Sequence, residues 1–113
     1  MSDFDPISRV ESVISDKIEK IFDNFGNMVV QTRSYLYDLH KNKKYSVGSR
    51  KILDSFAFKG KILVLTEKKA TVLNGNPENS DYLKVFGDFS GFQDGEKLSQ
   101  MAKTENFVFI LTD

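Results

Sequence analysis

The clearest pattern of apolar and polar positions lies near the start of the chain. Apolar residues recur there at intervals of three and four, the spacing that places side chains on one face of a helix. They are Ile7, Val10, Val13, Ile14, Ile18, Ile21, Phe22 and Phe25. Asp5 can cap such a helix, Pro6 suits its first turn and Gly26 can end it. The pattern predicts an amphipathic helix over residues 6–25 that docks on the chain's own sheet, with a partner surface or a coiled-coil seam as the alternative.

After this segment the pattern changes to that of strands, because stretches rich in β-branched and aromatic residues lie between turn signals. Strands are expected over residues 28–32, 34–37, 45–47, 61–66, 70–73, 82–86 and 107–111. Residues 50–58 and 97–103 fit either a helical turn or a strand. Loops are expected at residues 40–44, 74–80 and 87–95. The run from Phe107 to Leu111 is apolar throughout, which predicts a strand buried on both faces.

A sequence echo recurs at a spacing of 46 residues. Residues 51–67 lie without a gap over residues 97–113, and both copies close with a run of four apolar residues, a Thr and an acid. A looser copy places residues 26–32 over residues 60–66. Periods of roughly 40 to 50 residues that contain strands are typical of stacked or radially arranged β repeats. Two interpretations stay open: true repetition, or a chance match between apolar strands.

The repeated unit consists of a turn, an apolar strand, a tight turn and a second strand, and it resembles the inner hairpin of a β-propeller blade. Such hairpins occur in WD-like repeats, and similar repeats occur in tail-nozzle proteins of bacterial viruses. The resemblance covers residues 26–39, 60–74 and 107–113, although the Gly-His and Trp-Asp signatures are missing. It implies blade-like sheets, of which a closed propeller needs at least about four.

These patterns together predict a mainly β fold, an antiparallel meander of hairpins with one N-terminal amphipathic helix. Residues 1–113 are expected to form a single domain, with the helix at 6–25 and a β-rich region at 26–113. Partial propeller blades are the preferred version of this fold. A compact α+β domain is the alternative.

Composition narrows the chemistry that the chain can perform. It has no Cys, which excludes disulfides and thiolate chemistry, and a single histidine, His40, which lies among lysines and is expected to be solvated. No nucleophile motif or phosphate-binding loop is present. Asp88, Ser90, Asp94 and Glu96 could offer oxygen ligands, but their spacing does not match a calcium loop. No catalytic, cofactor-binding or metal-binding residue is therefore predicted, and the chain is not expected to be an enzyme.

Charge is distributed unevenly although the net charge is zero. Residues 28–72 carry ten basic and three acidic residues, whereas both flanking segments are acidic. The basic residues at predicted turns are candidate contacts for a partner or for phosphate groups. They are Lys43, Lys44, Lys59, Lys68 and Lys69. A solvated rim, or neutralisation by the acidic segments on folding, is the alternative.

The expected function is that of a non-enzymatic structural or protein-interaction module in a larger assembly, such as a virus particle or a scaffold. A nucleic-acid-associated accessory protein that uses the basic middle segment is the alternative. A protein partner or self-association is therefore expected, and no cofactor. No apolar run approaches the ~20 residues that span a bilayer, and the N-terminus lacks a signal-peptide pattern. The expected location is intracellular, in the cytoplasm or in a virus particle assembled there, with no membrane partner.

Overall fold

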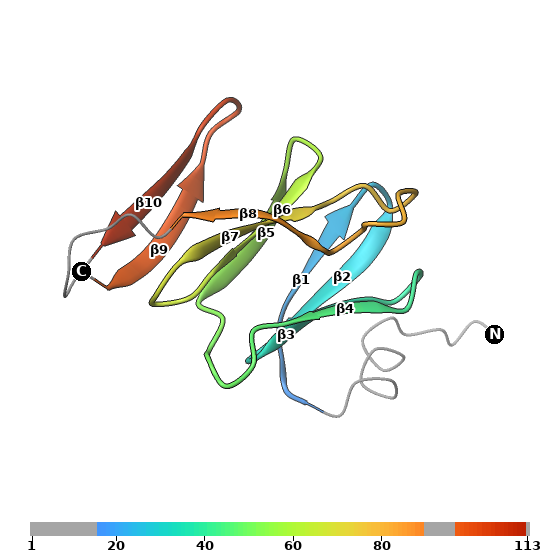
Figure 1. Ribbon diagram of the computed structural model, residues 1–113, viewed down its shortest axis with the longest axis horizontal. Coiled ribbons are helices and arrows are strands. Elements are labelled where there is room, and N and C mark those ends of the chain that lie inside the picture. The colour runs from blue at the N-terminus through green and yellow to red at the C-terminus, as the bar shows by residue number, and fades with distance from the viewer. Residues whose placement is uncertain (1–15, 90–96, 113) are drawn as a thin grey trace, which may run out of the picture.

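The computed structural model describes residues 16–89 and 97–112, and within them the regular elements are ten strands in three antiparallel sheets (Figure 1). Sheet I contains β1 (Ile18–Asn24), β2 (Asn27–Thr32), β3 (Tyr35–Asp38) and β4 (Lys43–Ser46). Sheet II contains β5 (Asp54–Phe58), β6 (Lys61–Leu65), β7 (Ala70–Asn74) and β8 (Val85–Phe89). Sheet III pairs β9 (Leu98–Lys103) with β10 (Val108–Thr112). The predicted mainly β class is therefore confirmed.

The three sheets follow one another in an open row, with sheet II between the other two (Figure 1). One apolar core joins sheets I and II and includes Val29, Ile62 and Val64. A second core joins sheets II and III and includes Leu63 and Leu65. Because successive side chains of a strand point to opposite faces, β6 contributes to both cores. This position between two sheets explains why β6 is apolar from Ile62 to Leu65.

Two hairpins turn through pairs of residues with positive φ. Phe25 and Gly26 have φ angles of 52° and 83°, and Lys59 and Gly60 have φ angles of 48° and 80°. Positive φ at both central residues is the requirement of a type I′ turn, whose twist matches that of the flanking strands. The residue pair ending in glycine therefore sets the register of β1–β2 and of β5–β6.

The strand pairing repeats between sheets. Four of the five residue pairs of β5–β6 become pairs of β9–β10 when 46 is added to both numbers, as Ala57↔Ile62 and Lys103↔Val108 illustrate. With a shift of 34, pairs of β1–β2 likewise become pairs of β5–β6. The longer shift arises in part because the β7–β8 connection, residues 75–84, is longer than the β3–β4 connection, residues 39–42. The sequence echo thus coincides with an echo in the backbone pairing.

The junctions between strands repeat as well. The hydroxyl oxygen of Thr32 accepts hydrogen bonds from the amides of Ser34 and Tyr35, at 3.4 and 3.3 Å. Thr66 accepts from the amides of Lys68 and Lys69 in the same way, at 3.3 and 3.4 Å. A threonine at the end of β2 and of β6 therefore caps each following turn.

The predicted helix is wrong where the structure can test it. Residues 18–24 form β1, and the other residues of the predicted segment that precede residue 16 lie outside the described residues. The spacing of apolar residues at intervals of three and four was misleading, because a strand with apolar residues on both faces can show the same spacing. Ile21 and Phe22, which share a helical face, lie on opposite faces of β1, and Gly26 belongs to a hairpin turn instead of a helix end.

Other predicted boundaries also shift. Residues 50–58 and 97–103, which fit two interpretations, contain β5 and β9. Residues 82–84 form a turn in place of a strand, because the side chains of Tyr82 and Leu83 are buried in the core between sheets I and II. Lys43 and Lys44 belong to β4 in place of a turn, and β8 extends to Phe89 inside a predicted loop.

Candidate functional site

The five candidate lysines do not form one cluster. Lys43 and Lys44 lie on β4, Lys59 lies in the β5–β6 turn, and Lys68 and Lys69 lie in the β6–β7 turn. Successive turns of an antiparallel meander lie at opposite ends of the sheet, so Lys59 is separated from the other turn by the length of β6. The structure brings together Lys43 with Lys44 and Lys68 with Lys69, as their positions in the sequence require.

Four of these lysines have neighbours within the chain. The Lys43 ammonium donates to a backbone carbonyl at 3.2 Å, and the Lys44 ammonium lies 4.9 Å from the ring centre of Tyr35. Lys59 donates to a side-chain oxygen at 3.2 Å, and Lys69 forms an ion pair at 3.5 Å with Asp88. Exposed contacts of this kind contribute little to stability, so the side chains can exchange them for a partner.

A depression of about 190 Å³ gathers basic residues beside the fifth lysine. Arg50, Lys51, Glu67 and Lys68 line it, and all four are exposed. The sequence placed these four residues in two separate segments, and the fold brings them together. Three basic residues and one acidic residue therefore surround this depression.

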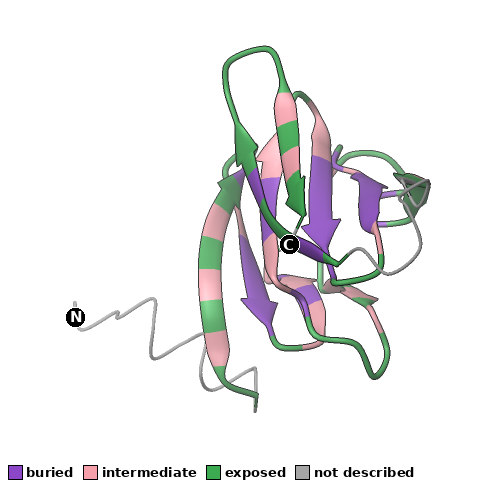
Figure 2. Ribbon diagram, turned by 90° about the vertical axis from the view of Figure 1, so that its left-hand side faces the viewer, coloured by how far each residue is buried: buried purple, intermediate pink, exposed green. Residues whose placement is uncertain are grey.

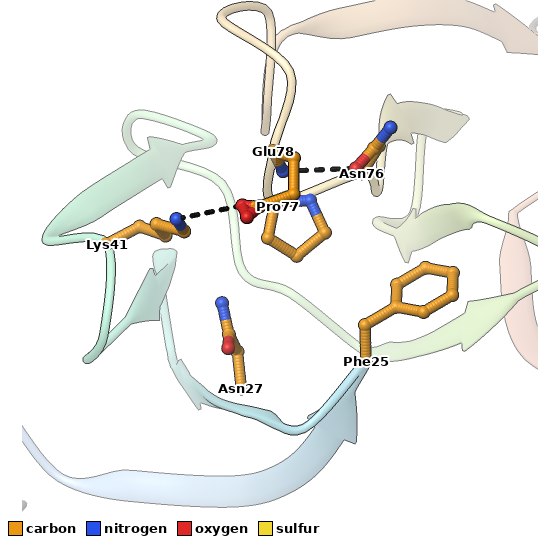
Figure 3. Close-up of a pocket in the computed structure, with 6 residues that line it drawn as sticks. All are labelled: Phe25, Asn27, Lys41, Asn76, Pro77 and Glu78. Carbon is orange, nitrogen blue, oxygen red and sulfur yellow. Dashed lines mark hydrogen bonds and ion pairs between the residues drawn. The ribbon is translucent and has the colours of Figure 1, made fainter.

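A second depression, of about 270 Å³, lies between the β1–β2 turn and the β7–β8 connection (Figure 3). Its lining includes the exposed ring of Phe25 and an ion pair at 3.3 Å between Lys41 and Glu78. Binding pockets normally enclose most of a ligand and direct a few buried polar groups at it. The lining residues here are exposed or half-buried, and the depression lacks that character.

Metal ligands do not converge in residues 16–89 and 97–112, where no group of three or more His, Asp or Glu side chains could hold an ion. His40 is exposed, and its Nδ1 accepts a hydrogen bond from the amide of Met28 at 3.4 Å. Of the loop considered for calcium, Asp88 pairs with Lys69, while Ser90, Asp94 and Glu96 lie outside the described residues.

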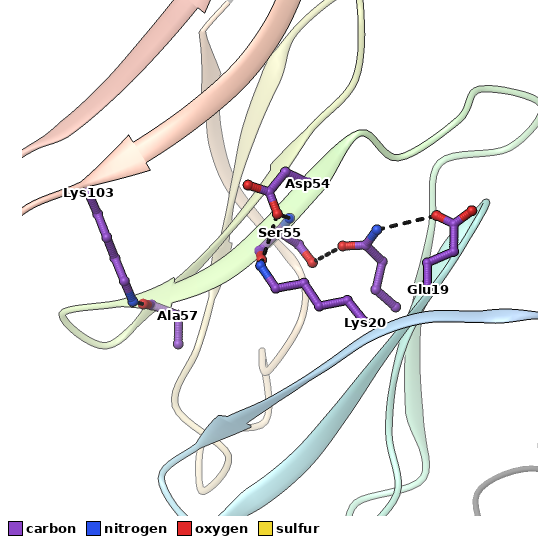
Figure 4. A network of polar contacts seen from close by, with 7 residues as sticks. Glu19, Lys20, Asp54, Ser55, Ala57 and Lys103 are labelled. Atoms are coloured by element: carbon purple, nitrogen blue, oxygen red, sulfur yellow. Dashed lines mark hydrogen bonds and ion pairs between the residues drawn. The ribbon is translucent and has the colours of Figure 1, made fainter. Parts of the chain in front are cut away.

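A polar seam joins the first strands of the three sheets (Figure 4). The ammonium of Lys20 on β1 lies 2.9 Å from a carboxylate oxygen of Asp54 on β5 and also donates to the carbonyl of Ser55. The Ser55 hydroxyl donates to the side-chain oxygen of Gln31. Lys103 on β9 donates to a β5 carbonyl at 2.8 Å. These hydrogen bonds connect one sheet to the next and pair the polar groups with one another, so their role is to align the sheets.

An exposed apolar face lies on sheet III, where half-buried and exposed residues alternate from Val108 to Leu111 of β10 (Figure 2). Phe107, Phe109 and Leu111 are 65%, 51% and 45% exposed, and the two phenyl rings lie 6.4 Å apart. The prediction that residues 107–111 are buried on both faces is therefore wrong. Sheet II covers one face of β10, whereas no described segment covers the other.

Comparison of the chain with models of protein families, with curated proteins and with solved structures finds no match. In the residues that the structure describes, no helix is long and apolar enough to cross a membrane. Because Phe107, Phe109 and Leu111 are exposed on it, the outer face of sheet III is the candidate functional site. Sequence reasoning missed it, although the echo that aligns Leu65 with Leu111 was the signal that could have found it.

Proposed function

We propose that the chain is a non-enzymatic structural or protein-interaction module that works within a larger assembly. The observation that carries the proposal is the exposure of Phe109, at 51%, where the equivalent Leu63 of sheet II is only 6% exposed. In sheet II the neighbouring sheet covers this position. A contiguous exposed apolar surface of this kind marks a protein-interaction site.

The blade resemblance supports the same function. Sheets I and II are both four-stranded antiparallel meanders with consecutive strand order, as the blades of a propeller are. Sheet III repeats the pairing of the first two strands of sheet II. We interpret the three sheets as blade-like repeats, and a virus particle or a scaffold assembled in the cytoplasm as the setting that this resemblance suggests.

The arrangement of the polar groups favours a role without catalysis. The buried polar side chains of the described residues hydrogen-bond to one another or to the backbone, and none is left without a partner. A catalytic site normally directs such groups into a cavity, where they can meet a substrate.

A photo-crosslinking amino acid at position 109 tests the proposal in cells that produce the full chain. We expect a crosslinked product of one discrete mass, because the exposed apolar face is covered by a specific protein. The same group at Phe86, an exposed residue of β8, serves as the matched control and should give no such product. Absence of the product at position 109, or an equal product at position 86, would contradict the proposal.

A nucleic-acid-associated role is the second candidate, and the gathering of Arg50, Lys51 and Lys68 around one depression favours it. Fluorescence anisotropy with labelled single-stranded DNA distinguishes the two roles. Phosphate contacts release counterions, so binding through Z contacts should weaken with a slope of about −0.7Z in log salt. Steeply salt-dependent binding that is lost in Lys68→Glu would favour this second role.

A further inference from the structure

Each sheet has two faces whose positions are equivalent through the repeat. We call the face of a sheet that packs against the preceding sheet its leading face. In sheet II this face packs against sheet I, and in sheet III it packs against sheet II. Four positions define it. These are Ile52, Ser55, Ile62 and Val64 in sheet II, and Leu98, Met101, Val108 and Ile110 in sheet III. The trailing face is the opposite face, formed in sheet II by Phe56, Leu63 and Leu65.

The two contacts between sheets follow one rule, in which a trailing face packs against the leading face of the next sheet. The backbone repeats this rule, since the amide of Ile52 donates to the carbonyl of Arg33 at 2.7 Å. At the equivalent positions, the amide of Leu98 donates to the carbonyl of Glu67 at 3.1 Å. The fold thus contains the same interface twice.

Two faces of the row remain uncovered by another described sheet. The trailing face of sheet III consists of Ala102, Phe109 and Leu111, and all three residues are exposed. The leading face of sheet I consists of apolar residues at the four defining positions. They are Ile18, Ile21, Met28 and Val30.

The leading face of sheet I has the apolar composition that the trailing face of sheet III requires, although Val30 is already fully buried against neighbours that include Tyr35 and Tyr37. Ile21 is 39% exposed and occupies the position of Met101, which packs against sheet II. Val30 occupies the position of Ile110, which also packs there. The part of this face that is open to a partner is therefore Ile21, flanked by the half-buried Ile18 and Met28.

We propose that a second copy of the chain docks head to tail, with its leading face of sheet I on the trailing face of sheet III. This inference rests on the proposed function and names the partner that covers the exposed face. It continues the internal interface between chains, so the partner needs no surface that the chain does not already use. Because the two faces differ, the contact is heterologous and forms a ring if the rotation closes, or a filament if it does not.

Sedimentation velocity of the full chain with two single variants tests this contact. Phe109→Glu places a charge on the trailing face, and Ile21→Glu places one on the leading face. We expect the wild type to form oligomers and each variant alone to remain a monomer. An equimolar mixture of the two variants should form a dimer that grows no further, because it contains one intact pair of faces. Phe86→Glu, which changes an exposed aromatic residue of neither face, should assemble as the wild type does.

Three results would overturn the head-to-tail contact: a monomeric wild type, an oligomer that only one of the two variants disrupts, or a mixture that stays monomeric. If either glutamate variant loses the circular dichroism spectrum of the fold, Phe109→Ser and Ile21→Ser replace the pair, with the same expectations. A monomeric wild type that still gives a discrete crosslink from position 109 to another protein would reject the second copy as partner and leave the proposed function standing. Absence of that crosslink rejects the proposed function itself.

Discussion

At the scale of single residues, the carboxylate of Asp38 organises the contact between sheet I and the β7–β8 connection. Asp38 is fully buried and accepts hydrogen bonds from the Tyr82 hydroxyl and from the amides of His40 and Lys41. Asn24 adds a bond at 2.9 Å to the carbonyl of Gly75. A buried carboxylate is stable only when donors surround it, so these residues hold the connection on sheet I.

The first prediction concerns Tyr82 and alkaline pH. Burial, and then the hydrogen bond to Asp38, raise the pKa of Tyr82 above the usual value of 10.0. The folded state therefore prefers the protonated phenol, and its contribution to stability is complete below pH 10 and falls as the pH rises toward the folded pKa. We expect Tyr82→Phe to be less stable than the wild type by about 1–3 kcal/mol at pH 7, with the difference shrinking above pH 10.

Urea unfolding from pH 7 to pH 11 measures this effect. Tyr37→Phe is the matched control, because the Tyr37 hydroxyl bonds to Asn42 at the exposed surface. A stability difference between the wild type and Tyr82→Phe that does not change with pH would contradict the account of Tyr82.

The second prediction concerns Gly75, where two chain segments approach closely. A Cβ atom at this position would lie 2.9 Å from the carbonyl oxygen of Gly60 and 2.9 Å from backbone atoms of Lys61. We expect Gly75→Ala to lower the free energy of unfolding by about 1–3 kcal/mol, because backbone must move to admit the methyl group. Gly87→Ala, where nothing lies within 4 Å of the new atom, should change stability little in the same urea titration. Equal losses in both variants would show that the close approach is not the cause.

At the scale of elements, the β1–β2 turn gives the third prediction. Phe25 has a φ of 52°, which is unfavourable for a bulky side chain, and its ring is 68% exposed. Asn adopts this conformation more readily, and Asn-Gly is the preferred type I′ pair. We expect Phe25→Asn to raise the free energy of unfolding by about 0.5–1 kcal/mol in thermal or urea unfolding. A loss of stability would mean that the ring of Phe25 contributes packing that outweighs the strain.

The fourth prediction compares two equivalent leucines. Leu65 is fully buried between sheets II and III, whereas Leu111 is 45% exposed. Leu65→Ala should cost about 2–5 kcal/mol in urea unfolding at low protein concentration. Leu111→Ala should cost under about 1 kcal/mol there and should weaken association instead. Similar losses of unfolding free energy would contradict the different environments of the two positions.

The elements that sequence could predict are those in which local chemistry and tertiary packing agree. The strands β2, β6 and β7 were predictable because β-branched residues lie between turn signals, and Lys59-Gly60 marked the hairpin between β5 and β6. The segment β1 was not predictable, because its apolar residues serve both faces of a sheet. Only the neighbouring sheets show that Ile21 and Phe22 have separate surroundings.

The candidate surface shows the same limit. The turn lysines were visible as charges, but their separation by the length of β6 depends on the order of the strands. The exposure of Phe109 depends on which sheets are stacked, and local hydrophobicity alone predicted burial. The information in the sequence that pointed to this surface was the repeat, since it aligns Leu63 with Phe109.

At the scale of the whole molecule, stability comes from sheets that pack through equivalent faces. Sheet II is covered on both sides, whereas sheets I and III are each covered on one side by a described sheet (Figure 1). The apolar contacts at both junctions are supplemented by the polar seam of Lys20, Asp54 and Lys103. The row therefore ends in an exposed apolar face on sheet III and in a partly exposed apolar face on sheet I, and association of these faces would bury both.

The mass of the wild-type chain in solution tests this central claim most directly. Size-exclusion chromatography with light scattering should be carried out at low and at high salt over a range of protein concentrations. Because apolar faces form the contact, the account predicts oligomers, either a closed ring or a growing filament, whose mass does not fall as the salt concentration rises. A monomer of 12.9 kDa at every concentration and at both salt concentrations would contradict it.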